Sequence, residues 1–125
     1  MVFGLGLMSA SAAGAYPTHD ACTTLGDART ALSLMVIAKD KPAQQALDAK
    51  VQAASAKLDS ELARLAGTDA QLANEVKDVW EQFKATREQK IIPAIYKGDT
   101  KDAKKIARGV QYVRLSKMWN LMSCK

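Results

Sequence analysis

Apolar residues recur every three or four positions along most of this chain, and only three short junctions interrupt the pattern. This spacing is typical of amphipathic helices, each of which buries one face. The pattern predicts four helices: one over residues 18–39, one that opens at the 40–42 turn and ends at Gly67, one that ends at Gly98, and one that begins after Asp99. Because such short junctions return the chain antiparallel, we expect an all-α fold, an antiparallel up-down-up-down four-helix bundle.

The junctions carry residues that start and stop helices. Asp40 can cap the second helix, with Pro42 in its first turn, where a helix tolerates proline. Thr68 and Gln71 have the spacing of a capping box for the third helix. Gly98 fits the left-handed position at which helices commonly end. The junctions therefore support the same four helices as the apolar pattern.

The residues expected to face the core share the helical spacing. In chain order they are Leu25, Ala28, Leu32, Met35, Val36, Leu47, Val51, Ala54, Leu58, Leu62, Leu65, Leu72, Val76, Val79, Phe83, Ile91, Ile95, Ala103, Ile106, Ala107, Val110, Val113, Met118, Leu121 and Met122.

Cys22 and Cys124 are the only two cysteines in the sequence. The predicted topology returns the end of the fourth helix to the start of the first, so both cysteines should lie at one end of the bundle. We therefore expect a disulfide, which in the chain-entropy model stabilises a loop of roughly 100 residues by up to about 4.7 kcal/mol. Such a bond indicates an oxidising compartment. The alternative is two unrelated buried thiols.

The N-terminal segment resembles the back half of a secretory signal. An apolar run over residues 2–8 precedes two triplets of the A-x-A form, at residues 10–12 and 13–15. The charged segment that normally precedes such a run is missing. We expect residues 1–15 to be a signal-peptide remnant or a disordered tail and residues 16–125 to form the bundle. The mature protein should then be periplasmic or secreted, without a membrane span.

The net charge of +5 does not indicate a nucleic-acid-binding protein. Lysine and arginine are spread along the chain with acidic residues between them, and the densest basic stretch, residues 97–108, still contains Asp99 and Asp102. Nucleic-acid binding would favour a basic stripe with interleaved aromatic residues. We expect a mildly cationic solvated surface and no nucleic-acid partner.

The sequence holds little catalytic material. His19 is the only histidine, and no nucleophile or acid is paired with it by spacing. His19, Asp20 and Cys22 would make an incomplete metal site, because zinc needs three or four ligands and an oxidised cysteine cannot serve. We therefore expect no enzyme and no metal site.

Several arginines depart from the apolar pattern. Arg87 and Arg114 each lie four residues from apolar core positions on both sides, and Arg29 should lie near the level of Arg114, with Trp80 and Phe83 close by. Guanidinium groups beside aromatic walls favour a groove for a small anionic ligand. The alternative is that each arginine lays its stem along the edge of the core and reaches water or a glutamate.

Two tryptophans should lie at the flanks of their helices. Trp80 follows the core position Val79, and Trp119 follows the core position Met118. Large aromatic residues at helical spacing are typical of a core or of a subunit interface. Because these two lie at the flanks of successive helices, we expect a homodimer.

The second half of the chain invites a family comparison. The features on which the comparison rests are the segment Trp80-Glu81-Gln82-Phe83 followed by Arg87, the stretch 91–96, the pair Gly98-Asp99, Ala103 and Gly109. With them the chain, from Leu72 onward, resembles the periplasmic four-helix-bundle ligand-binding domains of bacterial chemoreceptors and sensor kinases. That resemblance implies a small-molecule sensor fold with Arg87 and Arg114 as ligand contacts. The chain lacks the flanking transmembrane helix and signalling region of that family, which favours a free-standing binding or adaptor version.

More distantly, length, topology and the Lys/Ala-rich fourth helix are similar to the periplasmic b-type cytochromes and cytochromes c-prime. That resemblance implies a haem held by His19 and Met118. The sequence has no C-x-x-C-H motif and no histidine in the fourth helix. Three functions therefore stay open: a sensor-like ligand-binding bundle without cofactor, a structural or protein-interaction bundle, and a haem-binding electron-transfer protein.

Overall fold

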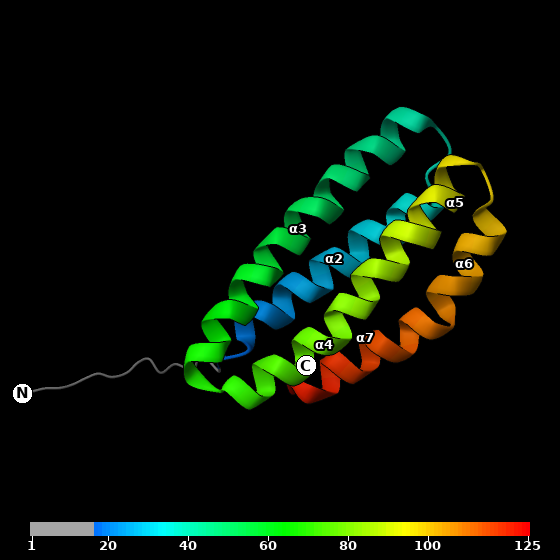
Figure 1. Ribbon diagram of the computed structural model, residues 1–125. Helices are drawn as coiled ribbons and strands as arrows, with labels where there is room; N and C mark the ends of the chain where they lie inside the picture. The colour runs from blue at the N-terminus through cyan, green and yellow to red at the C-terminus, as the bar shows by residue number, and fades with distance from the viewer. Residues whose placement is uncertain (1–16) are drawn as a thin grey trace, which may run out of the picture.

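The four predicted helices form in the predicted order in the computed structural model, which describes residues 17–125 (Figure 1). The elements are α2 (His19–Ile37), α3 (Lys41–Thr68), α4 (Ala70–Thr86), the π-helical turn η1 (Arg87–Ile91), α5 (Ile92–Tyr96), α6 (Thr100–Arg108) and α7 (Val110–Leu121). The third predicted helix is α4, η1 and α5 together, and the fourth is α6 and α7. Across the described residues the all-α antiparallel bundle is confirmed, and no strand occurs.

Most helix ends follow the expected chemistry. The Asp40 carboxylate accepts a hydrogen bond from the backbone N–H of Ala43 at 2.9 Å, and Gly98 adopts a positive φ of 81°. The capping box was predicted one residue too early: Thr68 is the last residue of α3, and Asp69 caps α4 by accepting from the N–H of Leu72 at 3.1 Å. Aspartate at this position satisfies another of the orphan N–H donors in the first turn of α4, so the junction keeps its length.

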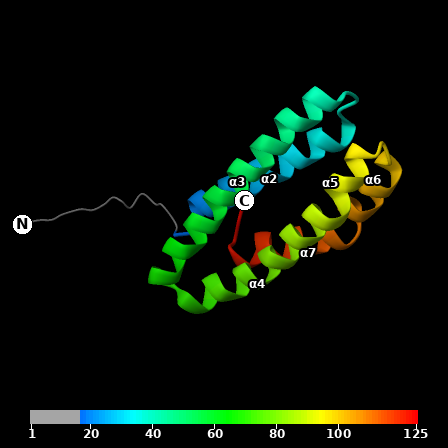
Figure 2. The same cartoon turned by 45° about the horizontal axis from the view of Figure 1, so that its top comes forward.

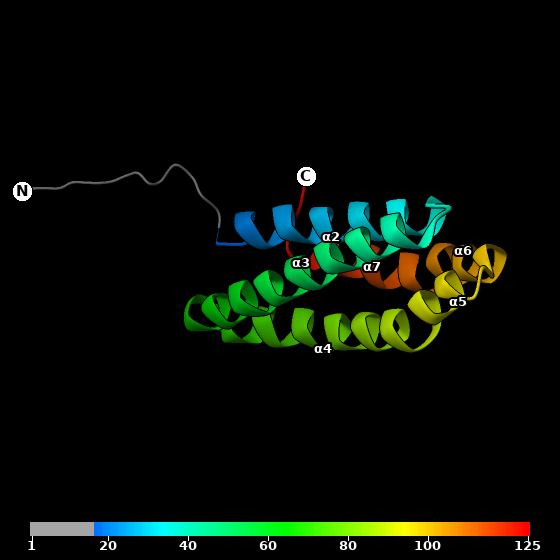
Figure 3. The ribbon, with the colours of Figure 1, turned by 90° about the horizontal axis from the view of Figure 1, so that it is seen from above.

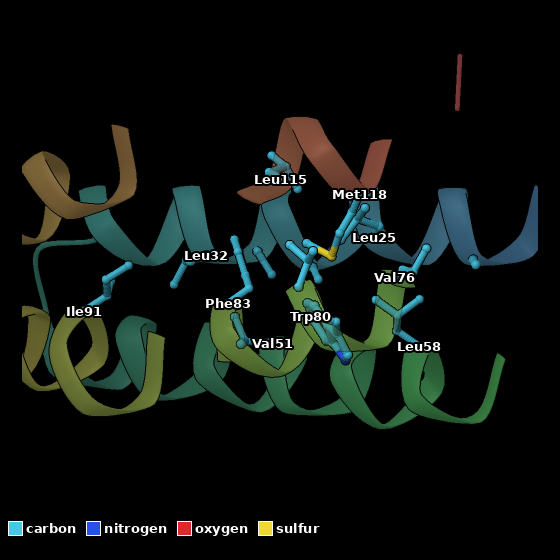
Figure 4. Packing of buried hydrophobic residues seen from close by; sticks show 14 of the residues in the cluster. Leu25, Leu32, Val51, Leu58, Val76, Trp80, Phe83, Ile91, Leu115 and Met118 are labelled. Carbon is cyan, nitrogen blue, oxygen red and sulfur yellow. The ribbon is translucent and has the colours of Figure 1, made fainter. Parts of the chain in front are cut away.

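The core lies along the axis between the four helices, with contributions from every long element (Figure 4). Its fully buried apolar side chains include Leu25 and Met35 of α2, Leu58 of α3, Trp80 of α4 and Met118 of α7. The inward faces predicted for α2 and for α4 to α5 are buried almost throughout. Burial of this kind is the main source of bundle stability.

The fourth helix departs from its predicted face. Val110 and Val113 are exposed, at 46% and 66%, while Gln111 and Leu115 are buried in their place. The cause is a break at Gly109, whose φ of −94° and ψ of −108° separate α6 from α7. A break resets the helical phase, so the apolar spacing of α6 does not continue into α7.

A π-helical turn changes the helix axis between α4 and α5 (Figure 3). The N–H of Ile92 donates to the carbonyl of Arg87, five residues back, and Pro93 follows in the first turn of α5. Because proline cannot donate a backbone hydrogen bond, a register change just before it is a common solution. The turn places Ile91, Ile92 and Ile95 in the core together.

The ends of the first and last helices are cross-linked. Cys22 and Cys124 form a disulfide with a Cα–Cα distance of 5.5 Å, as predicted. Beside it the Thr18 hydroxyl donates a hydrogen bond to the carbonyl of Met122 at 2.8 Å. None of the helices formed by residues 17–125 is long and apolar enough to span a membrane. The predicted division at residue 15 and the signal-like segment lie outside the described residues.

Candidate ligand groove

A groove of about 400 Å³ separates the C-terminal half of α2 from α6 and the start of α7. The C-terminal end of α2 lies beside α6 in both views (Figures 2 and 3). The disulfide joins Cys22 near the start of α2 to Cys124 beyond α7, and the backbone break at Gly109 separates α6 from α7 beside the groove. The lining residues are Arg29, Leu32, Ser33, Leu34, Val36, Ile37, Phe83, Lys104, Ala107, Arg108, Gln111, Tyr112 and Leu115. A volume in this range is typical of small-molecule sites, which span about 300–1,000 Å³.

The floor of the groove is apolar. Leu32 and Val36 of α2, Phe83 of α4 and Leu115 of α7 form it, and each is buried. Figure 4 shows Leu32, Phe83 and Leu115 on three different helices. An apolar ligand body could therefore leave water against these side chains.

The rims of the groove are cationic. Arg29 lies on the α2 side, and Lys104 and Arg108 lie on α6, four residues apart and so on one face of that helix. No carboxylate lines the groove, and none of the ion pairs within residues 17–125 involves these three side chains. The groove thus presents positive charge above an apolar floor.

Gln111 closes the groove at its deep side and is one of the few buried polar residues. Its amide nitrogen donates to the carbonyl of Phe83 at 2.8 Å, and its amide oxygen accepts from the Arg114 guanidinium at 3.0 Å. Arg114 also donates to the hydroxyl of Thr86 at 2.6 Å. These bonds fasten α7 to α4, so Arg114 faces that contact and does not line the groove.

Arg87 lies in a different place, between α3 and α4. Its side chain is 2% exposed, donates to the Ser55 hydroxyl at 2.7 Å and to the Glu88 carboxylate at 2.8 Å, and stands 5.8 Å from the Trp80 ring. The indole nitrogen of Trp80 donates to Asp59 at 2.7 Å. The five residues predicted to form one anion site are therefore divided: Arg29 and Phe83 line the groove, whereas the other three do not.

Arg87 belongs to a polar seam between α3 and the α4–α5 arm. Asp48, Gln52, Ser55 and Asp59 follow one another at helical spacing on α3, and each bonds a side chain of the opposite arm. This seam was not predicted from the sequence. The sequence does contain a pattern that indicates it, because each of the four polar positions comes one residue after an apolar position of α3.

Two groups in the seam have shifted pKa values. Burial, followed by the hydrogen bond that its hydroxyl donates to Asp48 at 2.7 Å, raises the pKa of Tyr96 to about 12. Burial lowers the pKa of Lys84, but hydrogen bonds to Asp59 and Glu81 outweigh this, so the pKa lies above its usual value. Burial is thus the first cause of the raised pKa of Tyr96, whereas acidic partners raise the pKa of Lys84 against the effect of burial.

The remaining predicted site residues are not brought together. His19 is exposed beside the disulfide, whereas Met118 is fully buried in the core and lines no pocket with it. This arrangement gives the haem hypothesis no support. Among the described residues no group of three or more histidine, cysteine, aspartate or glutamate side chains is placed to hold a metal ion.

The expected position of Trp80 at the flank of its helix was wrong. Trp80 is fully buried, because α4 turns its indole toward α3 and Asp59. Trp119 is half-buried and packs against the core. A homodimer stays a prediction, but the two tryptophans do not form an exposed pair.

No protein-family model, curated protein or solved structure matches this chain.

Proposed function

We propose that this protein is a non-enzymatic, exported four-helix bundle that binds a small ligand in the groove between α2 and α6–α7. The observation that carries the proposal is the combination of an apolar floor with cationic rims in a cavity of about 400 Å³. Its titratable lining groups are three cations and Tyr112, so the groove offers recognition groups and no carboxylate, histidine or cysteine for catalysis.

Two further observations support an exported, sensor-like or carrier role. The Cys22–Cys124 disulfide is of a kind that persists in an oxidising compartment such as the periplasm or the cell exterior. The bundle topology is also compatible with the resemblance of the second half to periplasmic ligand-binding domains. The proposed contact residues are those of the groove, not Arg87 and Arg114.

The uncharged fluorescent probe N-phenylnaphthylamine tests ligand binding in the groove without regard to charge. We expect saturable binding to the intact protein. Ser33→Phe should abolish most of it, because Ser33 lies on the groove and a phenyl ring there would fill the cavity. Ser60→Phe, on the exposed face of α3, is the matched control and should bind normally. Equal binding by both variants would place the probe elsewhere and contradict the proposal.

A protein-interaction bundle is the second candidate, and one observation favours it. The exposed large apolar residues of the described chain are Leu34, Ile37, Val110, Tyr112 and Val113, all on the C-terminal half of α2 or the start of α7. Apolar residues gathered in this way are typical of contact surfaces. If they hold a homodimer, sedimentation equilibrium should report a dimer that Val113→Lys dissociates. A monomer at high protein concentration would leave ligand binding as the better proposal.

A further inference from the structure

The charge of the groove narrows the class of ligand. Arg29, Lys104 and Arg108 supply positive charge from both sides, and no lining residue is acidic. An ammonium group of a ligand would find no carboxylate partner there, so cations and zwitterionic amino acids fit poorly. Guanidinium and ammonium groups instead match a carboxylate, which accepts charge-assisted hydrogen bonds from both.

The floor narrows the class further. Leu32, Val36, Phe83 and Leu115 present no polar side-chain atom to a ligand. A small hydrophilic anion would lose water against this surface without gaining hydrogen bonds from it. An aliphatic or aromatic body would instead gain from burial there. The floor therefore requires an apolar body in addition to the anionic group.

The cavity volume sets the size of that body. If each heavy atom takes about the 30 Å³ of a water molecule in the liquid, a cavity of about 400 Å³ holds roughly a dozen heavy atoms. Resting on the proposed function, we infer that the ligand is a free amphipathic carboxylate of this size, such as a medium-chain fatty acid. Its carboxylate lies among Lys104, Arg108 and Arg29, and its apolar body lies on the floor.

The test compares three ligands that share a ten-carbon chain and differ in the head group, below the concentration at which each forms micelles. Decanoate, decanol and decyltrimethylammonium would each be titrated by calorimetry and by displacement of N-phenylnaphthylamine. Acetate serves as the carboxylate without an apolar body. We expect decanoate to bind tightest, decanol to bind more weakly, and the ammonium and acetate to bind weakest.

A pair of double variants tests the cations. Lys104→Gln with Arg108→Gln should weaken decanoate binding about tenfold, since each removes a charged hydrogen-bond donor from the rim. Lys101→Gln with Lys105→Gln removes the same charge from the same helix at exposed positions that do not line the groove. That control should bind decanoate like the unmodified protein, and decanol should bind both double variants equally.

The outcomes separate this inference from the proposed function. If the probe binds in the groove but decanoate binds no tighter than decanol, or the two double variants behave alike, the groove is a ligand site and the carboxylate class is wrong. Acetate binding as tightly as decanoate would overturn the apolar part of the inference. Binding only above the micelle concentration would indicate adsorption to an anionic lipid surface and overturn it as well. Failure of every compound, the probe included, would overturn both proposals.

Discussion

The guanidinium of Arg87 is a charge held almost entirely away from water, and its three partners explain how. Ser55 and Glu88 accept its hydrogen bonds, and the face of Trp80 lies beside it. Glu88 remains partly solvated, so the pair does not bear the full cost of a buried ion pair. The helical spacing correctly placed Arg87 on an inward face. The alternative that the arginine reaches a glutamate agrees with Glu88. The helical spacing could not identify Ser55, because that partner depends on which helix the face meets.

Replacement of Arg87 should be among the most destabilising single changes in the bundle. Arg87→Ala leaves a cavity and a buried Ser55 hydroxyl without its donor, which together should cost about 3 kcal/mol in the free energy of unfolding. Arg87→Met keeps most of the volume and should cost less than half as much. Urea denaturation measures both, with Arg29→Ala, an exposed arginine, expected within about 0.5 kcal/mol of the unmodified protein. Equal losses for the alanine and methionine variants would contradict a packing role.

Tyr96 should titrate late. Its pKa of about 12 lies above the value near 10 of an unfolded tyrosine, so the folded state holds the phenolic proton more tightly. The sign follows: this contribution to stability is full below about pH 10 and is lost as the pH rises toward 12. Absorbance of tyrosinate should show one late midpoint that Tyr96→Phe removes and Asp48→Asn lowers. Tyr112→Phe should leave that midpoint in place. If Tyr112→Phe removed the late midpoint instead, the assignment to Tyr96 would be wrong.

At the scale of the elements, the breaks inside helices were harder to predict from the sequence than the helices themselves. The apolar spacing predicted α2 and α3 closely, because each is one uninterrupted helix, and Asp40 caps the start of α3 as expected. The same logic failed within the fourth predicted helix. Its spacing was counted through Gly109, where the backbone changes direction. As a result Val110 and Val113 were assigned to the core, and Gln111 was missed.

Two glycines in different elements should respond oppositely to alanine. Gly98 has a φ of 81°, which a Cβ disfavours, so Gly98→Ala should cost about 1–2 kcal/mol. Gly26 lies within α2, and a Cβ added there would meet no neighbouring atom within 4 Å, so Gly26→Ala should stabilise the protein by about 0.5–1 kcal/mol. Thermal unfolding of both variants gives the comparison. A stabilising Gly98→Ala would show that the turn after α5 does not need its left-handed residue.

For the whole molecule, the sequence analysis predicted the topology but grouped into one site five residues that the structure separates. Four helices with short junctions leave few arrangements, and the cysteines select the one that joins the first helix to the last. The groove depends instead on how α2 faces α6 and α7, which are far apart from it in sequence. The helical spacing correctly placed Arg29 and Phe83 near one level of the bundle. It missed Lys104 and Arg108, because α6 and α7 were predicted as a single helix.

Removal of the disulfide should weaken the whole bundle. The bond closes a loop with a sequence separation of 102, and the chain-entropy model gives its loss as up to about 4.7 kcal/mol. The double variant Cys22→Ala with Cys124→Ala should therefore unfold at a clearly lower urea concentration than the oxidised protein. The reduced unmodified protein should behave like the variant. An unchanged midpoint in both would mean that the remaining contacts already fix the two ends.

The cross-link has a topological consequence as well. Together with the chain it makes a covalent ring that begins at Cys22, passes through every helix and returns at Cys124. A protease that cuts one peptide bond in the 38–40 turn, or at the break around Gly109, would open this ring without releasing a fragment. Under oxidising conditions a once-nicked molecule would stay in one covalent piece, so the cut would become visible only after a reductant opens the disulfide.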